Sequence, residues 1–154
     1  MFNATGSGQN VIVEAIYAQP KTDVAVTGAV SARFDISRTS SAGTSGTSVP
    51  YATATVTGST IAPLDSRSPD LSTVTARIAP TAGATITTFL TYTYVFPEET
   101  NAAAFATNNI NILRENAPII LHPGQGLLIQ QDTVASVNSY SFQIIFSLEN
   151  DDAS

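Results

Sequence analysis

The stretch Thr85-Ile86-Thr87-Thr88-Phe89-Leu90-Thr91-Tyr92-Thr93-Tyr94-Val95-Phe96 decides the fold class of this chain. Its larger apolar and aromatic residues alternate with hydroxyl-bearing ones, the threonines being Thr85, Thr87, Thr91 and Thr93. Alternation with a period of two places one set of side chains in a core and the other in solvent or at an interface. Thr, Ile, Tyr and Phe also suit the pleated surface of a sheet. The stretch therefore predicts a long β-strand over residues 84–96.

The same alternation recurs along the chain, for example at Val30, Ala32, Phe34 and Ile36. Between these runs stand Gly, Pro, Asn, Asp and Ser, which are typical of turns. We expect eight to ten strands, near 11–18, 23–27, 29–37, 51–58, 71–79, 84–96, 109–115, 118–122, 126–131 and 139–149. Such spacing is typical of an all-β, antiparallel β-sandwich, and we expect a jelly-roll-like one. Only residues 98–107 favour a helical turn, and residues 39–48 and 63–70 are expected to be exposed loops.

A chain of 154 residues has the length of one domain. We expect a flexible N-terminal arm over 1–10, a single β-sandwich domain over 11–149 and an acidic tail over 150–154. The first residues lack the basic and apolar regions of a secretory signal peptide, and no apolar stretch is long enough to span a bilayer. We therefore expect a protein made in a cytoplasm, with no membrane partner.

The composition excludes several classes of function. Charged residues make up only 12% of the chain, about half of the usual share, whereas Thr and Ser together make up 24%. The net charge of −6 argues against binding to nucleic acid, which requires a basic surface. Without Cys and with a single His there is no zinc finger, iron–sulfur centre or disulfide framework. No glycine-rich phosphate-binding loop is present either.

The remaining chemistry-bearing residues give weak signals. His122 ends an apolar run just before a Pro-Gly turn, so we expect a histidine at the lip of a hairpin. The arginines Arg33, Arg77 and Arg114 fall in expected strands, where each can pair with an acid or face a subunit interface. A glycosidase would need a carboxylate pair, and the scattered acids are Asp65, Asp70, Glu98, Glu99 and Asp132. A calcium site would need Asp132 together with Glu14, Asp23 or Asp35. We expect no catalytic residue, no cofactor and no metal.

The scarcity of charge on the expected strands has a consequence for assembly. Lys and Glu normally protect the edges of sheets from pairing with other chains. A face of small hydroxyl side chains can instead be buried against a copy of the same protein, without the cost of desolvating charges. We therefore expect the row Thr85, Thr87, Thr91 and Thr93 to form an oligomer interface.

The segment 109–149 carries a resemblance to a known family. An apolar strand is followed by Ile120-Leu121-His122-Pro123-Gly124-Gln125-Gly126-Leu127-Leu128-Ile129, a polar spacer and a final alternating strand. This order resembles the closing hairpins of jelly-roll capsid decoration (cement) proteins of tailed bacteriophages. The resemblance implies a homotrimer on the outer capsid surface of a virion, which contacts the major capsid protein and stiffens the shell. It supplies no catalytic residues.

Two further hypotheses accompany this one. The expected N-terminal arm, with Met1, Phe2, Asn3 and Asn10, is a candidate for the capsid-contacting surface, because a flexible arm can become ordered on binding. The alternative function is a phage fibre-tip or receptor-binding module, which would stack cell-surface glycans on exposed aromatics such as Tyr51, Tyr92 or Tyr94. A carbohydrate-active enzyme would rest only on the scattered acids.

Overall fold

The computed structural model describes residues 1–22, 24–51, 58–62, 73–98, 105–106, 110–113, 117–131 and 138–151. Within these ranges the chain forms strands and turns and no helix, which confirms the all-β prediction. The strands are β1 (Phe2–Asn3), β2 (Gln9–Thr22), β3 (Val30–Thr39), β4 (Thr47–Ser48), β5 (Val74–Thr75), β6 (Arg77–Ile78), β7 (Thr85–Phe96), β8 (Phe105–Ala106), β9 (Ile110–Asn111), β10 (Ile119–Leu121), β11 (Gly126–Gln131) and β12 (Asn138–Asn150). None of the described segments is a helix that could cross a membrane.

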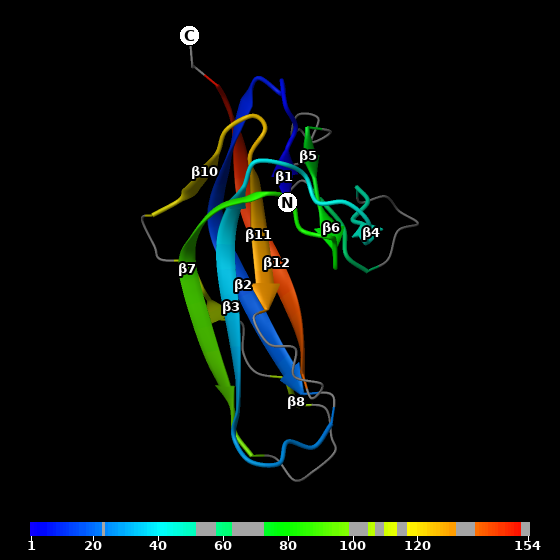
Figure 1. Ribbon diagram of the computed structural model, residues 1–154, viewed down its shortest axis with the longest axis vertical. Coiled ribbons are helices and arrows are strands. Elements are labelled where there is room, and N and C mark those ends of the chain that lie inside the picture. The colour runs from blue at the N-terminus through cyan, green and yellow to red at the C-terminus, as the bar shows by residue number, and fades with distance from the viewer. Residues whose placement is uncertain are drawn as a thin grey trace.

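The strands form two larger antiparallel sheets, which lie one behind the other in Figure 1. The first sheet has the order β5-β1-β11-β3-β7. In the second sheet β2 is central, with β12 on one edge and with β10, β9 and β8 on the other. A small sheet of β4 and β6 lies beside β5, on the side of the molecule away from β7. This arrangement is consistent with a β-sandwich.

The core lies between the two sheets and is built by the alternating residues. On β3, Ala32, Phe34 and Ile36 are buried, whereas Ser31 and Arg33 are exposed, as the alternation predicts. The main cluster also contains buried residues of β2, β10 and β11, namely Val11, Val13, Ile16, Ala18, Ile119, Leu121 and Leu127. A second cluster is aromatic: the Phe34 and Tyr140 rings meet edge-to-face at 4.3 Å, and Tyr94 and Phe96 at 4.8 Å. Edge-to-face contacts of this kind stabilise a core beyond the area that they bury.

Several expected elements differ in the structure. Residues 24–27 form no strand, and the expected strand 71–79 is represented in its described part by the short strands β5 and β6. The helical turn expected over 98–107 is wrong at Phe105–Ala106, which pair with β2 as β8. The loop expected over 39–48 contains β4, which pairs with β6. Residues 52–57 and 63–70 lie outside the described ranges.

The N-terminal arm expected over 1–10 is instead part of the fold. Phe2–Asn3 form β1, which pairs with both β5 and β11 inside the first sheet, and β2 already begins at Gln9. Asn3 is fully buried. The prediction of a flexible arm was wrong because a strand of two residues carries no periodicity, and its hydrogen-bond partners lie more than 70 residues away in the sequence.

Two irregularities in β7 change which threonines share a face. Along β3, Ile36 pairs with Leu90 but Ser37 pairs with Thr88, and Arg38 pairs with Thr87 but Thr39 with Thr85. Phe89 and Ile86 are therefore the extra residues of two β-bulges. Because cross-strand partners point to the same face, Thr85, Thr91 and Thr93 face outward, and Thr87 lies with Arg38 on the other face. The prediction of one shared face is wrong for Thr87.

Candidate functional site: the outer face of the first sheet

The outer face of the first sheet carries a compact polar network over β3 and β7. Arg33 Nε and Nη2 donate to Asp35 Oδ1 at 3.3 and 3.2 Å, and Thr91 Oγ1 donates to the same oxygen at 2.7 Å. The Thr91 hydrogen bond is the largest cause that holds the pKa of Asp35 below its ordinary value. Burial, the second-largest cause, acts in the opposite direction, and the Arg33 hydrogen bond and charge add smaller effects that lower the pKa. The acid and the base on this face therefore neutralise each other.

Beyond this network the outward side of β7 is uncharged. Thr91 and Thr93 are exposed, and the next outward side chain, Val95, is 56% exposed. Methyl, hydroxyl and paired charged groups are cheaper to bury than isolated charges. Chemically, this face is suited to packing against another protein surface.

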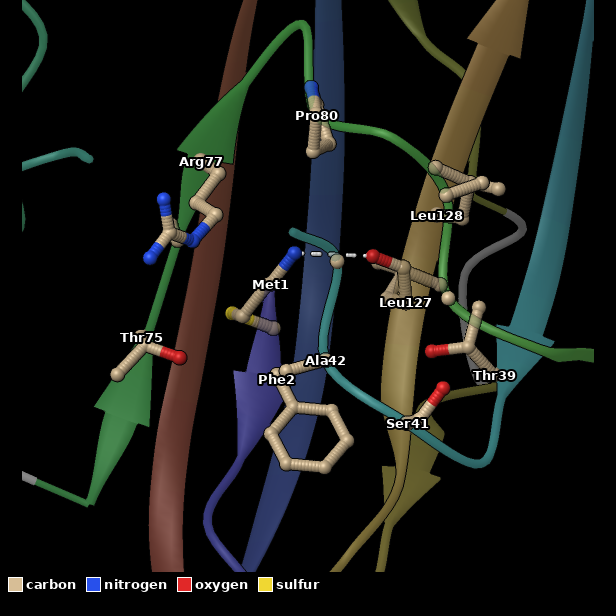
Figure 2. A pocket seen from close by; sticks show the side chains of 14 residues that line it. Met1, Phe2, Thr39, Ser41, Ala42, Thr75, Arg77, Pro80, Leu127 and Leu128 are labelled. Atoms are coloured by element: carbon tan, nitrogen blue, oxygen red, sulfur yellow. Dashed lines mark hydrogen bonds between the residues drawn. The ribbon is translucent and has the colours of Figure 1, made fainter. Parts of the chain in front are cut away.

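The N-terminal residues belong to the same sheet and are held in place by hydrogen bonds to it. The Met1 amine donates to the Leu127 carbonyl at 2.9 Å, and the Leu127 N–H donates to the Met1 carbonyl at 2.8 Å (Figure 2). The amine borders a small cavity of about 50 Å³, which is also lined by Phe2, Arg77 and Pro80. Burial lowers the pKa of this amine to about 6. The first residue therefore acts as part of the β1–β11 pairing.

Asn3 is the polar centre of this N-terminal anchor. Its Nδ2 donates to the Gln9 carbonyl at 2.7 Å and to the Leu121 carbonyl at 2.9 Å. Its backbone N–H donates to Gln125, and its carbonyl accepts from Gly124. Because Asn3 is fully buried, it cannot contact a capsid while the domain is folded. The prediction of a capsid-contacting surface at Met1, Phe2, Asn3 and Asn10 is therefore wrong for Asn3. Met1 and Phe2 are only partly accessible.

Gly126 is required where β1 meets β11. A Cβ at this position would lie 2.5 Å from Thr39 Oγ1 and 2.9 Å from both the Met1 carbonyl oxygen and the Phe2 ring. Gly126→Ala is therefore expected to push β1 off the sheet and to lower the free energy of unfolding by about 1–3 kcal/mol. Urea denaturation of the variant measures this loss. An unchanged midpoint would show that β1 does not pack here as described.

Asn10 belongs to a polar group at the end of the sandwich, with His122 and Asp151. His122 Nδ1 lies 2.8 Å from Asn10 Oδ1, and Asn10 Nδ2 donates to Asp151 Oδ1 at 3.3 Å. Because an amide oxygen only accepts, His122 Nδ1 is the donor of the first bond. His122 also stands next to the Pro123-Gly124 turn, where Gly124 has φ +82°. The histidine lies at the end of β10, as expected, but not at the lip of a hairpin, because β10 pairs with β2 and β11 pairs with β3 in the other sheet.

The structure places the three tyrosines of the glycan hypothesis in different environments. Tyr92 and Tyr94 point between the sheets and pack against core residues. Burial raises the pKa of Tyr92. Tyr51 is 39% exposed, and its hydroxyl donates to the Val74 carbonyl at 2.6 Å. Two of the three rings are therefore not available as platforms on the outer surface.

Of the candidate acids and arginines that the structure describes, Arg33 and Asp35 form an ion pair, as expected for a strand arginine, and the acids named for a calcium site do not meet. Glu14 lies on the second sheet and Asp35 on the first, while Asp23, Asp65, Asp70, Glu99, Asp132 and Arg114 lie outside the described ranges. Arg77 Nη1 donates to the Ser45 carbonyl at 2.9 Å. Among the described residues, no group of three or more His, Asp or Glu side chains could hold a metal ion.

Sequence reasoning missed Arg38 and Phe89, which lie beside each other at the open side of the sandwich. Arg38 was missed because it stands near the end of a regularly alternating strand, and the alternation alone does not show that its side chain lines a groove. Phe89 was missed because its exposure, 41%, depends on a bulge. The run Thr87-Thr88 is the one signal that could have found it, since it interrupts the alternation of apolar and hydroxyl residues.

The comparisons with known proteins define no family for this chain. No protein-family model, no curated protein and no solved structure matches it. The fold and the site define an antiparallel all-β, sandwich-like domain whose outer face carries the paired charges of Arg33 and Asp35 beside uncharged β7 side chains.

Proposed function

We propose that this chain is a non-enzymatic structural protein of a virion, which binds the outer capsid surface as a homotrimer and stabilises the shell. The observation that carries the proposal is the outward side of β7. There Thr91, Thr93 and Val95 are exposed and uncharged, beside an Arg33–Asp35 pair that is already neutralised. The major capsid protein is the proposed second partner.

Two further features support this proposal. The segment Ile120–Ile129, which carries the resemblance to decoration proteins, runs from β10 in the second sheet through a Pro-Gly turn to β11 in the first. β10 and β11 therefore do not pair as the hairpin that the resemblance implies, and the order of residues in this segment is what supports the proposal. A trimer would also gain avidity on a symmetric shell, so that modest contacts at each site suffice.

The mass in solution tests the homotrimer. Light scattering over a dilution series is expected to give a stable species of about 48 kDa, three times the chain mass of 16.1 kDa. The double variant Thr93→Glu/Val95→Glu introduces carboxylates at the proposed contact and is expected to shift the mass towards 16 kDa, because unpaired charges are costly to bury.

A matched control places the same charges elsewhere. Ser139 and Ser141 are exposed on β12 of the second sheet, and Ser139→Glu/Ser141→Glu is expected to leave the trimer intact. Co-sedimentation of the trimer with shells of major capsid protein then tests the capsid function. A monomer at all concentrations, which also fails to sediment with such shells, would contradict the proposal.

A further inference from the structure

The two sheets are open towards each other along one side of the molecule. β7 is the last strand of the first sheet, and β10 lies on the nearby edge of the second, as the left side of Figure 1 shows. Between them runs an open groove of about 420 Å³. Its lining residues come from β3, from β7 and from the segment that leads into β10: Arg38, Phe89, Leu90, Leu113, Ala117, Pro118 and Ile119.

The groove contains one cation among apolar side chains. Arg38 Nη2 donates to the Ile120 carbonyl at 3.2 Å, which bridges the two sheets. Its Nε is buried and donates to no acceptor. Within the described ranges Arg38 forms no ion pair, in contrast to Arg33, whose Nη2 lies 3.2 Å from Asp35 Oδ1. A guanidinium with unused donors in apolar surroundings is stabilised by a carboxylate, which it can bind through two hydrogen bonds.

The walls of the groove favour apolar side chains next to that carboxylate. Phe89, which lines the groove, is 41% exposed, and Ile120, whose carbonyl accepts from Arg38, is 40% exposed. Leu113 and Ile119 also line the groove and are almost completely buried. An occupant with a carboxylate flanked by Val, Ile or Leu side chains would therefore satisfy both the charge and the apolar surface.

The edge of β7 supplies the backbone partners. β7 is 12 residues long, and it contains no charged residue and no proline. Among the described strands only β3 pairs with it. Edge strands are ordinarily protected by Lys, Pro, β-bulges or short length. The bulges of β7 lie at Ile86 and Phe89, so its part from Leu90 to Phe96 is regular and has none of these protections. A long unprotected edge accepts an extended segment by strand addition, in which main-chain hydrogen bonds give affinity and side-chain pockets give specificity.

We propose that the groove and the β7 edge together bind an extended segment of a partner protein, in which a Glu or Asp stands between apolar residues. The carboxylate pairs with Arg38, and the main chain pairs with β7. A second copy of β7 does not meet these requirements, because β7 has no acidic residue to offer Arg38. The inference does not depend on the capsid function, since it concerns the recognition chemistry of the groove alone.

A labelled model peptide tests the proposal. The probe is a fluorescein-labelled octapeptide of alternating Val and Thr with one central Glu, and fluorescence anisotropy measures its binding to the full chain. We expect saturable binding below 1 mM, and Arg38→Gln is expected to weaken it about tenfold, because a charge-assisted pair is lost. The matched variant Arg77→Gln removes the same charge from β6, outside both the groove and the proposed trimer contact, and is expected to leave the affinity unchanged.

Two altered peptides separate the contributions of charge and backbone. Replacing the central Glu by Gln is expected to weaken binding to the wild-type chain, and Arg38→Gln then causes no further loss. N-methylation of alternate peptide nitrogens is expected to abolish binding, because the main-chain hydrogen bonds are lost. Circular dichroism confirms that each variant is folded.

Three outcomes would overturn the inference. The first is the absence of saturable binding up to 1 mM. The second is an equal response to Arg38→Gln and Arg77→Gln, which would indicate long-range attraction and no pairing in the groove. The third is that Phe89→Lys dissociates an oligomer of the chain, since the groove would then be occupied by a second copy.

Discussion

Asn3→Ala is expected to lower the free energy of unfolding by about 2–4 kcal/mol, a large share of the stability of a small domain. The substitution removes two hydrogen bonds, from Asn3 Nδ2 to the Gln9 and Leu121 carbonyls. Both carbonyls then lose a donor, and Leu121 is fully buried, so that water cannot replace it. An unsatisfied buried acceptor costs about 1–3 kcal/mol. Denaturation with guanidinium chloride measures the change.

Asn10→Ala is the matched control for this prediction. Asn10 also forms two side-chain hydrogen bonds, to His122 and Asp151, but it is half-buried at the end of the sandwich. Water can replace its partners, and the expected loss is below about 1 kcal/mol. Equal losses for the two variants would show that burial of Asn3 is not what makes its hydrogen bonds important.

Stability is expected to rise with pH between about 6 and 8, by up to about 2–3 kcal/mol. Burial lowers the pKa of the Met1 amine from 8.0 to about 6. Between these values the unfolded chain binds the proton and the folded chain does not, so each step towards higher pH favours the folded state. Below pH 6 both states are protonated, and the dependence disappears. Thermal unfolding at constant ionic strength measures the change.

His122→Gln is the control for the pH experiment. The chain has one His and no Cys, and the variant removes the imidazole as an alternative source of the pH dependence. The variant is expected to retain the rise in stability. Acetylation of the Met1 amine, which removes its titration, is expected to abolish the rise. A flat profile in the His122→Gln variant would contradict the buried position of the amine.

The faces of the long strands could be predicted from the sequence because they depend on local alternation. In β3, the assignment of Ala32, Phe34 and Ile36 to the core follows from the two-residue period, because no bulge in β3 interrupts it between these residues. In β7, the same rule fails at Ile86 and Phe89, since a bulge is set by the pairing with β3 and leaves little trace in composition. For this reason the sequence-based prediction assigned Thr87 to the wrong face of the sheet.

The N-terminal anchor and the groove could not be predicted for a different reason. Asn3 reads as a polar residue in a polar segment, and its burial depends on carbonyl groups of Gln9 and Leu121. The groove joins Arg38, Phe89 and Ile119, which are far apart in the sequence and are brought together only by the stacking of two sheets. Local patterns carry no information on such juxtapositions.

The insertion of β1 between β5 and β11 has a consequence for the order of folding. The bond from the Met1 amine to the Leu127 carbonyl spans 126 positions of the chain. Closing a loop of this size is slow compared with local pairing, and contacts of high sequence separation delay the formation of a native β-protein. During synthesis, the first three residues must wait for β11 before they can dock. Until then the first sheet lacks a strand between β5 and β11, and another extended chain can pair at that position.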